Sequence, residues 1–145
     1  MRRSLLVCTA MLLLVAAKKP MPEKAKSDKA LFQGTWTLRK GSEKNGRPLP
    51  PDLLTSLRIT FAGDRIIIKN RDDTKEGTFT IDPMSKPKAI TISHSDGKTR
   101  PSRGIYTFER GLLQMLFAEP GKKRPTGFRT EDKKVEFLSM QRVDS

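Results

Sequence analysis

The chain has 145 residues, the usual size of one domain, and its 29 basic against 16 acidic side chains give a net charge of +13. Hydrophobic residues make up 35% of the sequence, which is too many for a wholly disordered chain and enough for a small core. With one cysteine, Cys8, and one histidine, His94, the sequence excludes a Cys/His zinc site, a disulfide framework and a cysteine protease.

The first 17 residues have the features of an export signal. A pair of arginines precedes an uncharged, leucine-rich stretch over residues 4–17. This stretch is shorter than the roughly 20 apolar residues of a membrane span and has the length of a signal-peptide core. Small residues at its end predict cleavage after Ala17, so we expect a periplasmic or extracellular protein. A lipid anchor at Cys8 is disfavoured, because Val7 stands where a small residue is needed.

A polar segment follows, with the sequence KKPMPEKAKSDKA over residues 18–30. It has no apolar periodicity, which is typical of a disordered linker, and this one is basic. Short alternating runs of apolar and polar residues begin at Leu31, so we predict one folded domain over residues 31–145. We expect no transmembrane segment in the mature chain, because no further stretch is long and apolar enough.

The alternation in the folded region predicts about eight short strands separated by turn signals. In chain order they cover residues 32–39, 57–61, 65–69, 78–81, 90–93, 106–108, 113–117 and 135–142. One short helix is predicted from Asp52, after the first strand, because Pro51-Asp52 is a helix-start signal followed by two leucines.

The predicted fold is all-β, an antiparallel up-and-down barrel of roughly eight strands, lipocalin-like in form. A meander of hairpins left open would expose its edge strands, and closure removes those edges. The residues predicted to point inward are Trp36, Leu38, Leu57, Ile59, Phe61, Phe79, Ile81, Ile90, Ile92, Tyr106, Phe108, Leu113, Met115, Phe117, Leu138 and Met140. These are large side chains for a short barrel, so we expect a filled or nearly filled interior.

The start of the first strand, Gly34-Thr35-Trp36, resembles the G-x-W motif of lipocalins and related calycin barrels. The resemblance implies that the tryptophan closes one barrel end and that a basic residue of the last strand covers it. The matching position is Arg142, which shares its strand parity with Leu138 and Met140. The implied contact of a guanidinium with an indole ring is a cation–π interaction.

Residues 31–143 also resemble a planctomycete family of small β domains of uncharacterised function. The matching segments are Gln33-Gly34-Thr35-Trp36, Ile59-Thr60-Phe61, Gly63-Asp64, Glu76-Gly77-Thr78-Phe79, Asp82-Pro83, Lys86-Pro87-Lys88-Ala89-Ile90, Gly104-Ile105-Tyr106, Phe117-Ala118-Glu119-Pro120-Gly121 and Arg124-Pro125-Thr126. The resemblance implies export or surface association and a lipocalin-like fold, and it implies no catalytic residue. This chain departs from the family at Leu116, where a cysteine is common, and at Arg110-Gly111, where Gly-Asp is usual.

His94 is the first candidate site residue. It shares the parity of Ile90 and Ile92, so we expect it to point inward near a strand end, where it contacts a ligand at the barrel mouth or has a water or backbone partner. Its chain neighbours Ser93 and Ser95 point to the opposite face, so they form no Ser–His pair with it.

Two loops contain the other candidate ligand-binding residues. Lys98, Arg100 and Arg103 lie in one loop, and Lys122, Lys123 and Arg124 lie in the other. If the loops meet at one barrel end they form an anion-attracting rim, and otherwise they are an ordinary solvated basic surface. Expected partners of a rim are an anionic envelope polymer, a lipid surface or a small ligand. Export and the lack of interleaved aromatic residues argue against nucleic acid.

The sequence therefore predicts an exported, non-enzymatic binding or interaction domain that uses basic loops at one barrel end. A carrier of a small apolar or amphipathic ligand in a barrel cavity is the first alternative, and an uncharacterised enzyme is the second. No convergent set of nucleophile, base and orienting group is found, and no cofactor or metal is expected.

Overall fold

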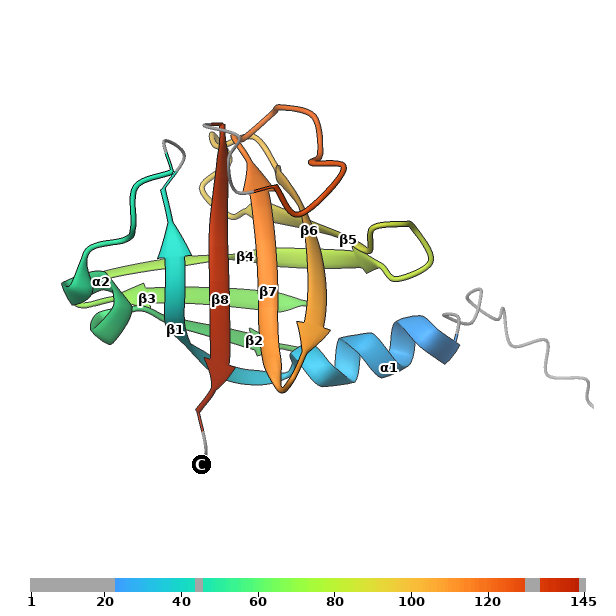
Figure 1. Cartoon of the computed structure of the whole chain (residues 1–145), viewed down its shortest axis with the longest axis horizontal. Helices are drawn as coiled ribbons and strands as arrows, with labels where there is room; N and C mark the ends of the chain where they lie inside the picture. Colours follow the sequence, from blue (N-terminus) through green and yellow to red (C-terminus); the bar gives the residue numbers. More distant parts are fainter. Residues whose placement is uncertain (1–22, 44–45, 130–133, 144–145) are drawn as a thin grey trace, which may run out of the picture.

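The structure is a computed structural model that describes residues 23–43, 46–129 and 134–143 (Figure 1). The predicted signal peptide over residues 1–17, its cleavage site, Cys8 and residues 18–22 of the predicted linker lie outside the described residues.

Eight antiparallel strands form a closed barrel in chain order, which confirms the predicted fold. The strands are β1 (Gly34–Ser42), β2 (Arg58–Ala62), β3 (Arg65–Asn70), β4 (Asp73–Asp82), β5 (Ala89–His94), β6 (Ser102–Glu109), β7 (Leu112–Ala118) and β8 (Val135–Arg142). Closure is made by β8 against β1, where Trp36 pairs with Arg142 and Leu38 with Met140. The short helix α2 (Pro51–Ser56) follows β1 as predicted. In Figure 1, β1, β8 and β7 run across β3 and β4, so the two halves of the barrel cross steeply.

The core fills the barrel from the inward strand faces. Every residue predicted to point inward is buried or packs against the buried cluster. Ile66 of β3 and Leu49 of the segment before α2 join this cluster, although the sequence analysis did not assign them to it. The alternation rule succeeds here because a strand with one wet face must place every second side chain in the interior.

Helix α1 (Glu23–Phe32) departs from the prediction, which placed a disordered linker over residues 18–30 and Phe32 on the first strand. An isolated helix of this length is marginal in water, so tertiary contacts must hold it. Phe32 supplies them, since its ring lies 4.9 to 5.7 Å from the rings of Phe61, Phe79, Tyr106 and Phe108. The polar sequence of the helix hid this anchor, because one buried aromatic residue produces no apolar periodicity.

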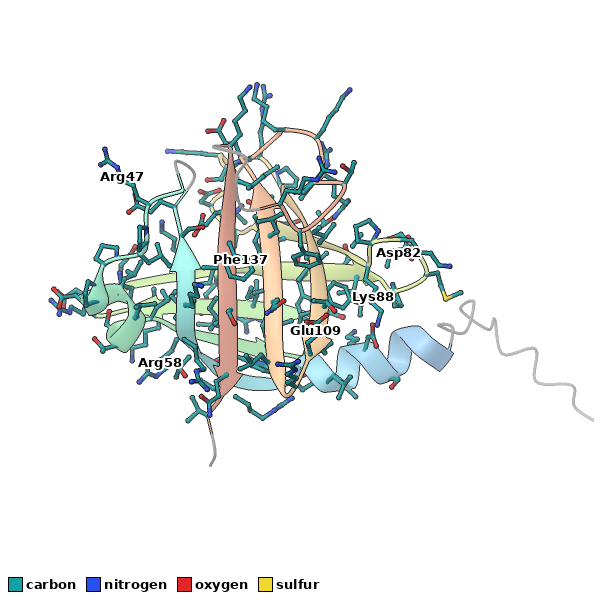
Figure 2. The ribbon with its side chains drawn as sticks, in the orientation of Figure 1. Arg47, Arg58, Asp82, Lys88, Glu109 and Phe137 are labelled. Atoms are coloured by element: carbon teal, nitrogen blue, oxygen red, sulfur yellow. The ribbon has the colours of Figure 1, made fainter. Side chains whose placement is uncertain are left out.

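A buried polar contact fixes the same helix to the barrel. The Tyr106 hydroxyl donates to the Asp28 carboxylate at 2.7 Å, and Lys88 Nζ lies 3.0 Å from the same oxygen. Figure 2 shows Lys88 above α1. Burial, and then the hydrogen bond to Asp28, raise the pKa of Tyr106. The phenol therefore stays protonated and remains a donor. Asp28 is only 5% exposed, so these two partners satisfy a carboxylate that would otherwise be costly to bury.

A second, smaller apolar cluster lies outside the barrel wall, where the prediction placed polar side chains. Ile105, Leu116 and Val135 are buried there, and Phe137 packs against them. The segment 124–126 after β7 lines a cavity together with Ile105, so this segment folds back over the wall. Residues 124–126 are thus part of the packed structure, which matters for the basic side chains nearby.

Candidate functional site

The two ends of the barrel differ in construction. At the closed end, where β1 begins and β8 ends, Phe32 of α1 sits among aromatic side chains. The open end lies where β5 and β7 finish and β6 and β8 start. The loops after β5 and β7 lie together at the top of Figure 1, away from α1. We call these segments, 95–101 and 119–129, the basic loops.

The closed end brings together Gly34, Trp36 and Arg142. The Arg142 guanidinium lies over the Trp36 ring, 4.6 Å from its centroid, and also donates to the carbonyl oxygens of Gln33 and Leu31. Trp36 Nε1 donates to the Phe32 carbonyl at 2.8 Å. Gly34 has a φ of +118°, and a Cβ there would lie 2.8 Å from Arg142 Nη1. Glycine therefore permits both the backbone conformation and the approach of the arginine.

A pocket of about 300 Å³, the mouth pocket, occupies the open end. Its apolar walls come from Ile59, Ile66, Ile68, Ile92, Met115, Phe117, Ala118, Pro120 and Leu138. The prediction of a filled or nearly filled interior thus describes the closed half of the barrel and not the open half.

A polar group of side chains borders the mouth pocket, consisting of Lys75, His94, Thr99, Ser102 and Glu136. His94 Nε2 lies 3.1 Å from Ser102 Oγ. His94 is where its strand parity placed it, at the inward end of β5. The two serines adjacent to His94 in the chain are both exposed, as their predicted outward position requires. Ser93 pairs with Thr78, and Ser95 Oγ donates to the Glu76 carbonyl. Ser102 was missed because it comes from the next strand, opposite Ile92, and only the register reveals it.

Asp96 shapes the turn that presents Thr99 to the mouth pocket. Its carboxylate accepts from the backbone amides of Lys98 and Thr99, each at 2.9 Å, and from the Thr99 hydroxyl. These hydrogen bonds, with the Thr99 hydroxyl contributing most, lower the pKa of Asp96 from 3.8 to about 2.

A pH titration of the Thr99 amide checks this turn. Because the folded pKa of Asp96 is depressed, its stabilisation is present above about pH 4 and is lost as the pH falls toward about 2. We expect the Thr99 amide resonance to move with a midpoint near pH 2 in NMR spectra, and Asp96→Ala to remove that transition. A midpoint near 3.8 in the parent protein would contradict the turn geometry.

The basic loops meet at the open end, as a rim requires. Gly121 N donates to the Pro101 carbonyl at 3.1 Å. Arg103 lies on β6 and not in the loop predicted for it, and its Nη1 lies 3.5 Å from the Lys122 carbonyl. The Arg100 side chain passes against Gly121, where an added Cβ would lie 2.6 Å from Arg100 Cδ. Among the described residues, Lys98, Arg100, Lys122 and Lys123 form no ion pair.

Arg124, the sixth predicted rim residue, has a different place. Its Nη1 donates to the carbonyls of Ile90 and Gly104, both at 2.6 Å, and its Nη2 donates to Thr91 Oγ1 at 2.8 Å. Burial, and then the nearby charge of Arg103, lower the pKa of Arg124. Its guanidinium ties the second basic loop to β5 and β6, so the structure assigns it to loop anchoring first.

The described residues contain few other groups that could form a functional site. Within this part of the chain, no group of three or more His, Cys, Asp or Glu side chains is placed to hold a metal ion. None of the described helices is long and apolar enough to cross a membrane. The features that could bind a ligand are therefore an apolar pocket with a polar border and, beside it, two loops with an excess of positive charge.

Comparison with known proteins finds a solved structure of low sequence identity. No protein-family model and no curated protein matches the chain. A similar solved structure is the crystal structure of a DUF4847 family protein from Bacteroides vulgatus, which is 19% identical with a TM-score of 0.48. The similarity covers 81% of this chain and 99% of that chain.

Proposed function

We propose that the protein is an exported, non-enzymatic binding domain that takes a small amphipathic anion into the mouth pocket. The observation that carries this proposal is the division of the pocket into an apolar interior and a polar border. Ile92, Phe117 and Leu138 suit an alkyl group, whereas Lys75, His94 and Ser102 offer hydrogen-bond partners at the entrance.

The charge around the entrance favours an anionic head group. Lys75 and Glu136 border the pocket with opposite charges, and the adjacent loop after β5 adds the positive charges of Lys98 and Arg100. Several positive side chains around a low-dielectric opening raise the local concentration of anions. A carboxylate is therefore preferred over an ammonium group on the same alkyl chain.

The non-enzymatic part of the proposal rests on how His94 is held. Among the described residues its ring has one side-chain hydrogen-bond partner, Ser102. The nearby carboxylate of Asp96 is occupied by Lys98 and Thr99. A serine nucleophile needs a base that a third group orients, and this pair lacks that group in the described part of the chain.

The proposal extends to family and compartment. We place the chain in the planctomycete family of small β domains that its motifs resemble, with a calycin type of barrel. The stacking of Arg142 on Trp36 supports the calycin assignment. Export after cleavage near Ala17 is proposed on the N-terminal sequence alone.

A ligand series tests the pocket. At roughly 30 Å³ per non-hydrogen atom, the pocket accommodates about ten such atoms, which matches octanoate. At about 0.5 kcal/mol per atom, we expect a dissociation constant on the order of 0.1 mM by calorimetry. Octanol is expected to bind about fivefold more weakly and octylammonium more weakly still. Equal binding of all three compounds would contradict the anion preference, and binding of none would contradict the pocket.

Native mass spectrometry of protein recovered from the cell envelope addresses the natural ligand and the export together. We expect a chain that starts near Lys18 and carries one small bound mass per barrel. A chain that retains residues 1–17 would contradict the proposed cleavage.

A further inference from the structure

A second cavity lies outside the barrel, between the segment 118–126 and the start of β8. It has a volume of about 530 Å³, and Lys122, Lys123, Arg124 and Lys134 border it together with a single described acidic residue, Glu119. We call it the loop cavity. It shares Ala118 with the mouth pocket, but Ala118 ends β7, so the wall of the barrel divides the two.

We propose that the basic loops and the loop cavity form a binding surface for an acidic polysaccharide. This surface goes beyond the ligand of the mouth pocket and does not depend on it. The partner class is identified from its charge, from the shape of the surface and from the composition of the loops.

Packing holds several positive groups of this surface close to one another. Arg124 is fixed by three hydrogen bonds to β5 and β6, and Arg103 lies near enough for its charge to act on it. Arg103, on β6, also reaches the Lys122 carbonyl, which holds its guanidinium beside the second basic loop. Such an arrangement is unfavourable by itself and is relieved by a bound anion.

The shape of the two loops also brings these charges together. Gly121 has a φ of +78°, and the Arg100 side chain passes directly against it. A side chain at position 121 would both strain the turn and push Arg100 away from the second loop. The approach of Arg100 to the second loop therefore depends on glycine at position 121, which supplies a sharp test.

The charge and the shape of this surface favour one class of partner. The second basic loop lines the concave loop cavity and the first lies against it, so an extended chain with repeated anionic groups can contact both. A flat anionic membrane cannot enter the cavity, and Phe128, 37% exposed, is the single exposed large hydrophobic residue in the described part of the basic loops. A single-stranded nucleic acid is matched by several stacking aromatics along a groove, which these loops do not present.

The test uses the purified full chain and fluorescein-labelled dextran sulfate, with uncharged dextran as the control polymer. We expect saturable binding to dextran sulfate that weakens as salt is added. Replacing Lys122 and Lys123 together by glutamine is expected to weaken this binding about tenfold at 0.1 M salt. The charge-matched control, Lys40→Gln with Lys69→Gln on exposed strand positions, is expected to change it less than twofold.

Two glycine variants separate loop geometry from charge. Gly121→Ala and Gly111→Ala impose the same backbone strain, since their φ values are +78° and +77°. Only position 121 has Arg100 against it, and nothing lies within 4 Å of a Cβ at position 111. We expect Gly121→Ala to weaken binding about threefold more than Gly111→Ala, although both variants retain octanoate binding.

Several outcomes would overturn the proposal. If the Lys122/Lys123 and Lys40/Lys69 variants lose the same affinity for dextran sulfate, binding depends on net charge alone and not on this surface. Tighter binding to phosphatidylglycerol vesicles or to DNA than to dextran sulfate would replace the polysaccharide by another partner class. Loss of octanoate binding in the Lys122/Lys123 variant would place the effect on the mouth pocket instead, so failure of this proposal is distinguishable from failure of the proposed function.

Discussion

Replacing Phe32 by alanine is expected to lower the free energy of unfolding by about 3–5 kcal/mol. The ring is fully buried and touches four other aromatic rings, and its removal leaves a cavity where α1 meets the barrel. A loss of this size is a large fraction of the stability of a domain, about 5–15 kcal/mol. Urea unfolding followed by circular dichroism measures it.

The adjacent residue provides the matched control. Leu31 belongs to the same helix and is 46% exposed, so Leu31→Ala is expected to cost less than about 0.5 kcal/mol. Similar, small losses from both variants would mean that α1 is not an integral part of the closed end.

Replacing Ser102 by phenylalanine is expected to weaken octanoate binding by more than about 30-fold. Ser102 borders the mouth pocket, so a benzyl group there fills space that the alkyl chain needs and removes the hydrogen bond to His94. The lost apolar contact of even three buried methylene groups, at about 0.8 kcal/mol each, accounts for a loss of this size. Calorimetry with octanoate measures the affinity.

The control is Ser93→Phe on the outer face of β5, where the serine is exposed and pairs with Thr78. It adds the same side chain outside the pocket and is expected to change the affinity less than twofold. Retention of full affinity by Ser102→Phe would place the ligand somewhere other than the mouth pocket.

The barrel was predictable because its strands obey one simple rule. Alternation assigned the inward residues, and the resemblance of Gly34-Thr35-Trp36 to the calycin motif implied the contact of Arg142 with Trp36. Helix α2 was predictable from Pro51-Asp52, since a proline in the first turn is a local signal.

Helix α1 was not predictable by the same means. Its composition is polar, and the contact that stabilises it joins Asp28 to Tyr106, which is 78 positions away in the chain. Local sequence carries no record of such a pairing. The outer apolar cluster was missed for a related reason, because Ile105 and Leu116 occupy the face that alternation assigns to solvent, and a long loop covers them.

The candidate site was half predictable. His94 could be placed at the mouth by parity, whereas Lys75 and Ser102 gather beside it only once the registers of β4 and β6 are known. Arg124 was predicted to face a ligand because it lies in a basic run, yet its donors bond to backbone oxygens of β5 and β6. Charge in the sequence identifies a basic loop but not which of its side chains the fold uses.

An NMR titration of the protein with octanoate tests the central proposal, an open barrel end that binds a small amphipathic anion, most directly. We predict saturable shifts of the amide resonances of Ile92, His94 and Ser102, with no change at Phe32 and Trp36 of the closed end. Shifts confined to the closed end, or none at millimolar octanoate, would contradict it.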